Sequence, residues 1–361
     1  MDKNFTPLKL AFEKHQWDWE ESENLFKCIN VRNKNRMWLY DYNFNVLVPR
    51  NHKVLVKCRG IVVQDDGVIL NYPFNRFFNE REKEHADINW RTAIAQEKID
   101  GSLLNTFWNG NSWEASTRGS FYPNDFADID FAQEFWRLFK RRDNLNKDFC
   151  YMFELVSELN RNITYYDSER VYLIGARNLN TLQEVSQEGL DIWAKSLDVW
   201  RPMRYNANDF IECKKLFEHF KDDDEGLVVV DDNFNRVKLK QESYLKLVKI
   251  KALSEQDIFD YVLGKVQVDI EYLQKLPEVT NMVKFIKLHW CVMLAEIMVV
   301  FEENKNKATR KEFALAVMKY PYKHVLFALL DNSNVSEMNL KWEDIKTWFP
   351  MYFDFLKTLY G

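Results

Sequence analysis

The sequence predicts an α+β fold in which a domain built on antiparallel sheet is followed by an all-helical domain. Hairpin signals recur through the first 245 residues, helical patterns intervene there only twice, and after about residue 250 helical periodicity replaces the hairpins. A chain of 361 residues is long enough for two domains at roughly 150 residues each. We therefore expect one domain at residues 1–248 and a second at residues 249–361.

Three segments of the first domain have the form strand, turn, strand, and they cover residues 60–72, 103–117 and 226–240. Their turns contain Asp-Gly, Asn-Gly and Asp-Asp-Asn between β-branched or aromatic runs, and Asp-Gly and Asn-Gly are the strongest short hairpin signals. Two further strands are predicted at 151–156 and 171–177, and the two helices at 129–142 and 205–220.

The second domain is predicted to contain only helices. Ser254 is a plausible N-cap for a helix that follows it, because its side chain can accept from a free backbone N–H. Apolar residues at helical spacing then recur in four further segments, at 278–302, 307–319, 321–331 and 341–359.

Glycine usage excludes two common nucleotide sites. The chain has only 10 glycines and no Gly-x-Gly, so it has neither the dinucleotide fingerprint nor the glycine-rich P-loop. If this protein binds nucleotide phosphates, Lys and Arg side chains must hold them.

Other residue counts bound the class further. Five scattered cysteines without Cys-x-x-Cys indicate reduced thiols in a cytoplasmic protein, and six histidines show no metal-binding spacing. The first 20 residues lack the apolar run of a signal peptide, and the most apolar stretch, 290–301, is too short to span a bilayer.

A lysine followed by Asp-Gly-Ser precedes the second hairpin, at Lys98, Asp100, Gly101 and Ser102. Alone, this pattern is weak, because a surface lysine before a strand has the same appearance. An ordered series of motifs surrounds it: Arg59-Gly60, Phe74–Asn79 with Arg76 and Phe78, Ser116–Ser120 with Arg118, Phe153–Val156 with Glu154, Glu225–Val228, Val237–Lys240 with Lys238, and Tyr244.

This series resembles the covalent nucleotidyltransferases, the polynucleotide ligases and capping enzymes, and in detail the bacteriophage T4 RNA ligase 1 type. The resemblance covers roughly residues 55–245 and implies that the first domain is an antiparallel-sheet adenylyltransferase domain. Arg76 and Arg118 stand where the phage enzymes commonly have lysine, which keeps the charge but changes the hydrogen-bond geometry.

The chemistry of the predicted site centres on Lys98. A lysine attacks phosphorus only as the neutral amine, and nearby cations or partial burial disfavour the ammonium form. Lys238 and Lys240, two apart on a strand, point to one face, so we expect them to lower the pKa of Lys98 and to neutralise phosphates. A solvated strand face is the alternative for this pair.

The other candidates are binding residues. Arg59 and Arg76 suit phosphates, because a guanidinium makes bidentate contacts. The resemblance implies that Glu154 contacts the ribose, that Glu225 supports a metal or the lysine, and that both act on Mg²⁺ through water. It also adds five nucleotide-site residues: Phe78, Asp100, Gly101, Arg118 and Tyr244. For Phe78 and Tyr244 the alternative is a core position, and for Glu225 a surface acidic run.

The resemblance implies an ATP-dependent RNA ligase that forms lysyl-AMP on Lys98, passes AMP to an RNA 5′-phosphate and seals it to a 3′-hydroxyl. That the polymer is RNA comes from the resemblance alone, chiefly from Asp-Gly-Ser and the Phe-Phe-Asn block. The resemblance implies a role in RNA or tRNA repair, in which nicked tRNA is one substrate and an end-healing kinase/phosphatase cooperates. It also implies action in the cytoplasm, which is the host's cytoplasm if the protein is viral. A DNA ligase, an mRNA capping enzyme and a non-catalytic RNA-binding protein remain alternatives.

The net charge of −5 is unusual for a protein that binds a polyanion. Two basic groups relieve this tension, with six Lys or Arg each at residues 236–251 and 304–323. The first belongs to the predicted active site. The second predicts RNA binding by the helical domain, with an ordinary solvated helix face as the alternative.

Overall fold

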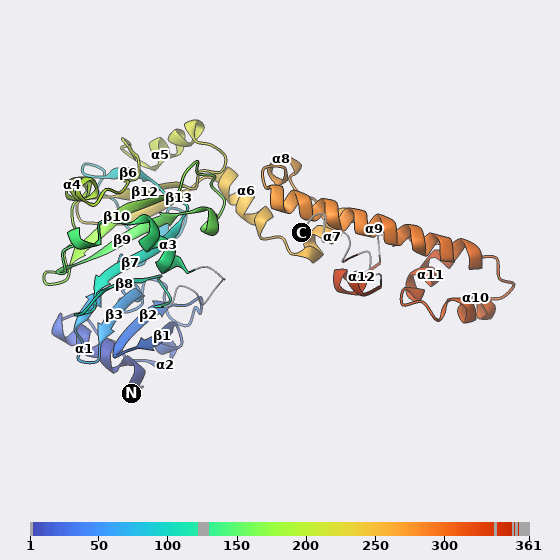
Figure 1. Cartoon of the computed structure of the whole chain (residues 1–361), viewed down its shortest axis with the longest axis horizontal. Helices are drawn as coiled ribbons and strands as arrows, with labels where there is room; N and C mark the ends of the chain where they lie inside the picture. Colours follow the sequence, from blue (N-terminus) through green and yellow to red (C-terminus); the bar gives the residue numbers. More distant parts are fainter. Residues whose placement is uncertain (1–2, 122–129, 336–337, 349, 351–352, 354–361) are drawn as a thin grey trace. The chain divides into compact units, whose positions relative to one another are not determined.

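The computed structural model describes residues 3–121, 130–335, 338–348, 350 and 353. The chain divides into two compact units, Met1–Tyr244 and Leu245–Gly361. The first contains three β-sheets with short helices, and the second contains helices (Figure 1). The α+β class predicted from the sequence is confirmed.

The first sheet has the order β1-β2-β3-β4 and is antiparallel throughout. Its strands are β1 (Ile29–Lys34), β2 (Met37–Tyr42), β3 (Arg59–Gln64) and β4 (Ile69–Asn71). The helices α1 (Thr6–Lys14) and α2 (Glu23–Phe26) precede it, and apolar side chains of α1 and of β3 share one core.

The second sheet has the order β10-β9-β7-β8 and is also antiparallel. Its strands are β7 (Ser102–Trp108), β8 (Trp113–Ser116), β9 (Phe149–Val156) and β10 (Arg170–Asn178). One apolar cluster packs α3 (Phe131–Leu138) and α4 (Gln187–Leu197) on this sheet, and another joins it to the first sheet.

The third sheet has the order β11-β6-β12-β13-β5, with β5 parallel to β13 and the other pairs antiparallel. Its strands are β5 (Phe78–Asn79), β6 (Ile94–Glu97), β11 (Arg204–Tyr205), β12 (Gly226–Val230) and β13 (Arg236–Lys240), and α5 (Phe210–Leu216) packs on it. This sheet and the second one form the walls of the cavity described below.

All three predicted hairpins are confirmed, as β3–β4, β7–β8 and β12–β13. The predicted strands at 151–156 and 171–177 are β9 and β10. The predicted helix at 205–220 is shorter, because residues 204–205 pair with β6 and the helix begins only after the Asp209 N-cap. Most of the predicted helix at 129–142 is α3, and residue 129 lies outside the described residues.

The helical unit contains α7 (Glu255–Val262), α8 (Ile270–Leu273), α9 (Pro277–Asn304), α10 (Arg310–Val317), α11 (Lys323–Leu330) and α12 (Trp342–Trp348), while α6 (Glu242–Lys251) crosses the division between the units. The Ser254 N-cap is confirmed, since its hydroxyl accepts from the backbone of Asp257. Most of the predicted helix at 341–359 beyond α12 lies outside the described residues. Among the helices that the structure describes, none is long and apolar enough to cross a membrane.

Candidate active site

A cavity of about 240 Å³ opens between the second and third sheets of the first unit. Strands β6, β12 and β13 contribute one wall, and β7, β9 and β10 contribute the other. Five of the predicted site residues line it: Arg59, Lys98, Glu154, Lys238 and Lys240. Its apolar lining comes from residues such as Phe74, Phe77, Leu103, Ile174 and Val228. The cavity thus combines a slot suited to a flat ring with cations suited to phosphates.

Lys98 lies directly after β6, where its backbone N–H donates to the carbonyl of Gly226 at 2.9 Å. Its Nζ is 2.5 Å from Oε2 of Glu225, and the Nζ of Lys240 is 2.7 Å from Oε1 of the same carboxylate. The Glu225 side chain is only 4% exposed. One buried carboxylate therefore holds two of the predicted site lysines, which excludes the surface acidic run for Glu225.

The predicted lowering of the Lys98 pKa is wrong. Burial lowers the pKa of Lys98, but the carboxylates of Glu225, Glu154 and Asp100 outweigh burial and raise the pKa above its ordinary value. Of the lysines that line the cavity, Lys238 has a depressed pKa. Its pKa falls to about 8 through burial and the nearby cations, Arg59 first among them.

Glu154 and Arg59 reach the cavity from β9 and β3. Burial raises the pKa of Glu154 to about 7, although Lys98 and Arg59 oppose the shift. Burial also lowers the pKa of Arg59, and its Nη1 is buried with no hydrogen-bond partner among the described residues. A buried guanidinium nitrogen without a partner costs free energy, so this atom is a strong candidate for contact with a ligand oxygen.

Asp100 anchors the loop that follows Lys98. It is 5% exposed, and its Oδ2 accepts from the backbone N–H groups of Ile163 and Thr164 at 2.8 and 2.9 Å. Its Oδ1 accepts from the hydroxyl of Tyr244 at 2.8 Å. These bonds occupy the carboxylate, so Asp100 and Tyr244 organise the loop after Lys98 from outside the cavity lining.

Gly101 and Gly226 are required by close backbone approach. A Cβ on Gly101 would lie 2.3 Å from the carbonyl oxygen of Leu155, and a Cβ on Gly226 would lie 2.0 Å from that of Leu239. Gly226 also has a φ of +138°, which favours glycine. These glycines let the segments that carry Lys98 and Glu225 pack against neighbouring strands.

Arg76 and Arg118 lie beside Tyr42, and Phe78 lies beside Arg76, all three outside the lining of the cavity. The guanidinium carbons of Arg76 and Arg118 are 4.1 and 4.7 Å from the centre of the Tyr42 ring. Arg118 also pairs with the buried Asp41 at 3.1 Å. Phe78 is 4% exposed and packs, as the core alternative expects. The structure therefore separates these three from the five residues that line the cavity.

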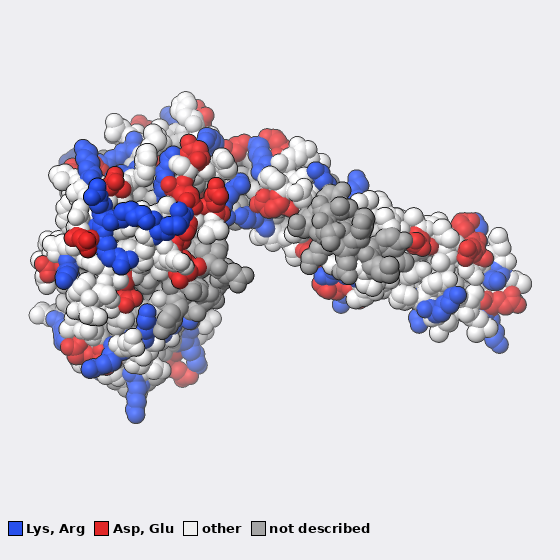
Figure 2. Space-filling view, in the orientation of Figure 1, with Lys and Arg blue, Asp and Glu red and all other residues white. Residues whose placement is uncertain are grey.

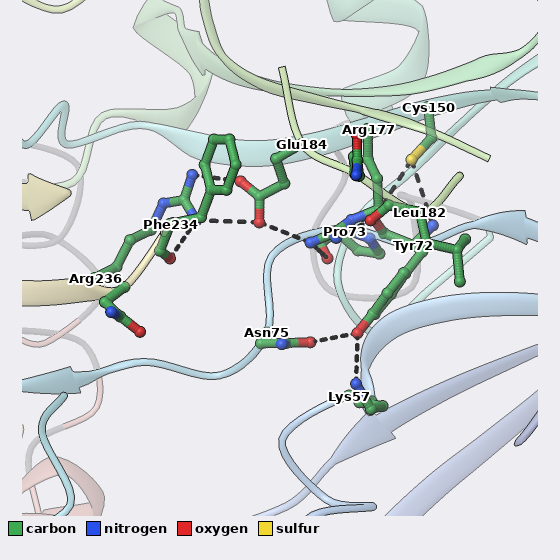
Figure 3. A network of polar contacts seen from close by, with 12 residues as sticks. Lys57, Tyr72, Pro73, Asn75, Cys150, Arg177, Leu182, Glu184, Phe234 and Arg236 are labelled. Atoms are coloured by element: carbon green, nitrogen blue, oxygen red, sulfur yellow. Dashed lines mark hydrogen bonds and ion pairs between the residues drawn. The ribbon is translucent and has the colours of Figure 1, made fainter. Parts of the chain in front are cut away.

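A buried network of polar contacts includes Arg236, which lines the cavity (Figure 3). Glu184 bridges two guanidinium groups, with Oε1 2.7 Å from Arg177 Nη2 and Oε2 2.5 Å from Arg236 Nη2. Arg177 also donates to the carbonyl of Tyr72 at 2.9 Å, and the Arg236 guanidinium lies 4.2 Å from the Phe74 ring. Because these residues come from the second and third sheets and from the chain after β4, the network joins these two sheets beside the cavity.

Several residues that the structure brings to the site have no role predicted from the sequence. Gln96 and Gln187 line the cavity and hydrogen-bond to each other, and Arg236 lines it beside them. Asp41 and Tyr42 position Arg118. Arg236 carried a signal, its place in the basic group next to Lys238, whereas no local pattern marks Gln187 or Asp41.

A lysine held by a buried carboxylate at the edge of a cation-lined cavity is the arrangement of a covalent nucleotidyltransferase, the class that contains the polynucleotide ligases. A family model described as RNA ligase, of T4 RNA ligase 1 type, matches residues 57–251. The match covers more than half of the chain, which belongs to this family of RNA ligases and is a ligase enzyme.

Two relatives extend the comparison. The chain is 26% identical over 381 residues to the RNA ligase of Rhodothermus phage RM378, covering 82% of this chain and 86% of that protein. It is 28% identical over 233 residues to a protein of Autographa californica nuclear polyhedrosis virus described as "Putative bifunctional polynucleotide kinase/RNA ligase". That match covers 57% of this chain and spans only 33% of the viral protein.

Among solved structures, an archaeal ATP-dependent RNA ligase is similar with a TM-score of 0.47 and 10% identity, over 84% of each chain.

Proposed function

We propose that this protein is an ATP-dependent RNA ligase that works through an AMP bound covalently to Lys98. The observation that carries the proposal is the position of Lys98 Nζ, 2.5 Å from Glu225 at a cavity that Arg59, Lys238 and Glu154 also line. Family membership supports the reaction class, and the cavity supports nucleotide binding.

In the first step, the neutral amine of Lys98 attacks the α-phosphorus of ATP, a P–N bond forms and pyrophosphate leaves. Lys98 has to lose a proton first, and Glu225 is the carboxylate that contacts its ammonium group. Arg59 and Lys238 would hold phosphate oxygens, since positioning and charge neutralisation supply most of the acceleration in phosphoryl transfer. The apolar side chains that line the cavity would enclose the adenine.

Mg²⁺ fits the residues that are present. The described residues contain no group of three or more potential metal ligands, which agrees with an ion that keeps most of its waters and binds one or two carboxylates plus phosphates. Glu154 and Glu225 would hold it, mainly through water. When bound, it would supply positive charge that neutralises phosphate oxygens and favours the neutral form of the lysine.

In the later steps, AMP passes from Lys98 to the 5′-phosphate of an RNA, and a 3′-hydroxyl then displaces AMP to seal the strand. A nicked tRNA is the substrate we favour, in RNA repair with a separate kinase/phosphatase that prepares the ends. The baculovirus relative supports that cooperation, because its description joins a polynucleotide kinase to an RNA ligase. Cysteines that are all unpaired among the described residues fit action in the cytoplasm.

The helical unit's basic group at 304–323 receives less support. Lys305 pairs with Glu302 at 2.5 Å, and Arg310 pairs with Asp331 through two contacts at 2.5 and 2.9 Å. Figure 2 shows Lys and Arg interspersed with Asp and Glu on the drawn face of this unit, whereas a continuous band of Lys and Arg crosses the first unit. We therefore propose RNA contact mainly by the first unit, with Lys307 and Lys311 as secondary contacts.

The test is covalent labelling. The protein is incubated with Mg²⁺ and ATP or GTP labelled at the α-phosphate, next to the Lys98→Ala variant. Label from ATP that disappears in the variant supports the proposal, and label from GTP indicates a capping enzyme. Absence of label from both nucleotides overturns it and leaves a non-catalytic RNA-binding protein. Sealing of 5′-phosphorylated single-stranded RNA against nicked DNA then separates an RNA ligase from a DNA ligase.

A further inference from the structure

A second cavity, of about 270 Å³, lies beside the loop that follows Lys98. Asp100 and residues from the segment 156–169 line it, whereas Lys98 and Ile99 line the first cavity. The two residues that follow the nucleophile therefore lead from one cavity to the other. A group bound in the second cavity lies next to the chain segment on which AMP would be carried.

Tyr165 lines this second cavity and is 63% exposed, although its backbone is tightly held. Its N–H donates to Oδ2 of Asp223 at 2.7 Å, and the hydroxyl of Thr164 donates to the carbonyl of Asp223 at 2.6 Å. The N–H of Thr164 donates to Asp100 at 2.9 Å. An exposed aromatic ring on such a fixed loop loses little conformational freedom on binding, which favours its use as a contact surface.

Arg161 completes a pair with this ring. Its guanidinium carbon is 5.3 Å from the centre of the Tyr165 ring, and Arg161 also lines the cavity. Aromatic rings and guanidinium planes are the surfaces on which unpaired RNA bases stack. The pair is thus built from the two side-chain types that suit a nucleobase.

The acidic residues around the second cavity do not prevent the approach of RNA. Asp167 pairs with Arg170 and Glu169 pairs with Arg137, each at 2.6 Å. The carboxylate of Asp100 is taken up by backbone N–H groups and Tyr244, and Glu158 is solvent-exposed. Ion pairs and hydrogen bonds therefore offset three of the four carboxylates in the lining, and Glu158 remains a negative charge that RNA would meet.

We propose that Tyr165 and Arg161 form a stacking site for an unpaired base of the RNA strand that is being sealed. This rests on the proposed function, because it names a contact of the RNA substrate beside the same nucleophile. The site receives a base near an RNA end and holds that end close to Lys98. It is sequence-tolerant, since every base offers a stacking face.

The test compares Tyr165→Ala with Tyr165→Phe, which keeps the ring, and with Phe44→Ala, which removes an 89% exposed aromatic on the first sheet's side of the unit. The full-length proteins are titrated, with Mg²⁺ and without ATP, with a short 5′-phosphorylated single-stranded RNA in a fluorescence anisotropy assay. We expect Tyr165→Ala to bind about 5- to 150-fold more weakly, and the two controls to stay within about twofold of the unchanged protein. Arg161→Ala should show a smaller loss in the same direction.

A series of RNAs with one abasic position each removes the base and keeps the phosphates. At one position or more, the abasic RNA should bind the unchanged protein as weakly as intact RNA binds Tyr165→Ala, and the variant should lose nothing further there. The inference is overturned if Tyr165→Ala binds intact RNA as tightly as the unchanged protein does. It is also overturned if, at every abasic position, the losses of affinity from Tyr165→Ala and from removal of the base simply add. AMP labelling of Lys98 is measured in parallel and uses no RNA. If the unchanged protein takes up no label from ATP, that result counts against the proposed function and not against the stacking site.

Discussion

Removal of the Glu184 carboxylate should cost the first unit a large part of its stability. Its carboxylate bridges Arg177 and Arg236, and all three side chains are only 7–8% exposed. Glu184→Ala leaves two buried guanidinium groups without their shared counter-charge. Breaking a buried ion pair by removing one partner costs about 3–5 kcal/mol, and two stranded cations place this variant at the upper end.

A loss of this size is a large part of the stability of an ordinary domain, which is about 5–15 kcal/mol. Glu184→Gln keeps the shape and one acceptor oxygen, so we expect a smaller loss. Glu218→Ala removes an exposed carboxylate from the same unit and should change the free energy of unfolding by less than about 0.5 kcal/mol.

Pulse proteolysis over a urea series is the suitable assay, because mass spectrometry of the surviving fragments assigns each transition to one of the two units. The refuting result is a Glu184→Ala transition that coincides with that of Glu218→Ala. Such a result would mean that the desolvation of these three charges cancels their attraction, and that the network fixes geometry without stabilising the fold.

Three further predictions concern the site. Arg59→Lys keeps the charge but loses the guanidinium fork, so the KM for ATP in self-adenylylation should rise about 10-fold or more, and unchanged initial-rate kinetics would contradict a phosphate contact. Gly101→Ala places a Cβ 2.3 Å from the carbonyl oxygen of Leu155, so the free energy of unfolding should fall by about 1–3 kcal/mol, the thermal midpoint should fall with it, and AMP labelling should be lost. A variant that keeps both its thermal midpoint and its AMP labelling would refute this packing. Burial raises the pKa of Asp41 from 3.8 to about 7, so the folded state keeps a proton that the unfolded state loses, and stability falls as pH rises from about 4 to about 7. Asp41→Asn lacks this dependence. In urea unfolding, the free energy of unfolding of the variant should therefore rise relative to that of the unchanged protein, by up to about 4 kcal/mol between about pH 4 and about pH 7. A difference between the two proteins that does not change with pH would rule the effect out.

Local turn chemistry explains which hairpins were predictable. Gly67 and Gly110 have positive φ angles in the turns of two predicted hairpins, and a glycine at such a position is what makes the turn predictable from the sequence. The β1–β2 hairpin makes the same kind of turn with Asn35 and Arg36, at φ of 50° and 66°. Arginine seldom adopts that conformation, so this hairpin has no comparable signal in the sequence.

The site divides in a similar way. Lys98, Glu154, Glu225, Lys238 and Lys240 follow one another in a recognisable order, and the structure brings all five together. Pairings across long separations, such as Gln96 with Gln187, depend on how the sheets pack and leave no local pattern.

The error in the pKa of Lys98 has the same origin. The motifs reveal which charges gather around the lysine, but the sign of the shift depends on which of them lie nearest. Carboxylates lie nearest in this structure.

The contact between Lys98 and Glu225 has a consequence for the reactivity of the resting protein toward other electrophiles. Burial is outweighed by the nearby carboxylates, which raise the pKa of Lys98 above its ordinary value, so its ammonium form persists at neutral pH and does not attack activated esters or aldehydes. Lys238, with a pKa of about 8, is neutral in roughly a tenth of the molecules at neutral pH, so of these two site lysines it is the more reactive toward such reagents. The contact with Glu225 thereby protects Lys98 from this kind of damage, while Lys238 stays vulnerable to it.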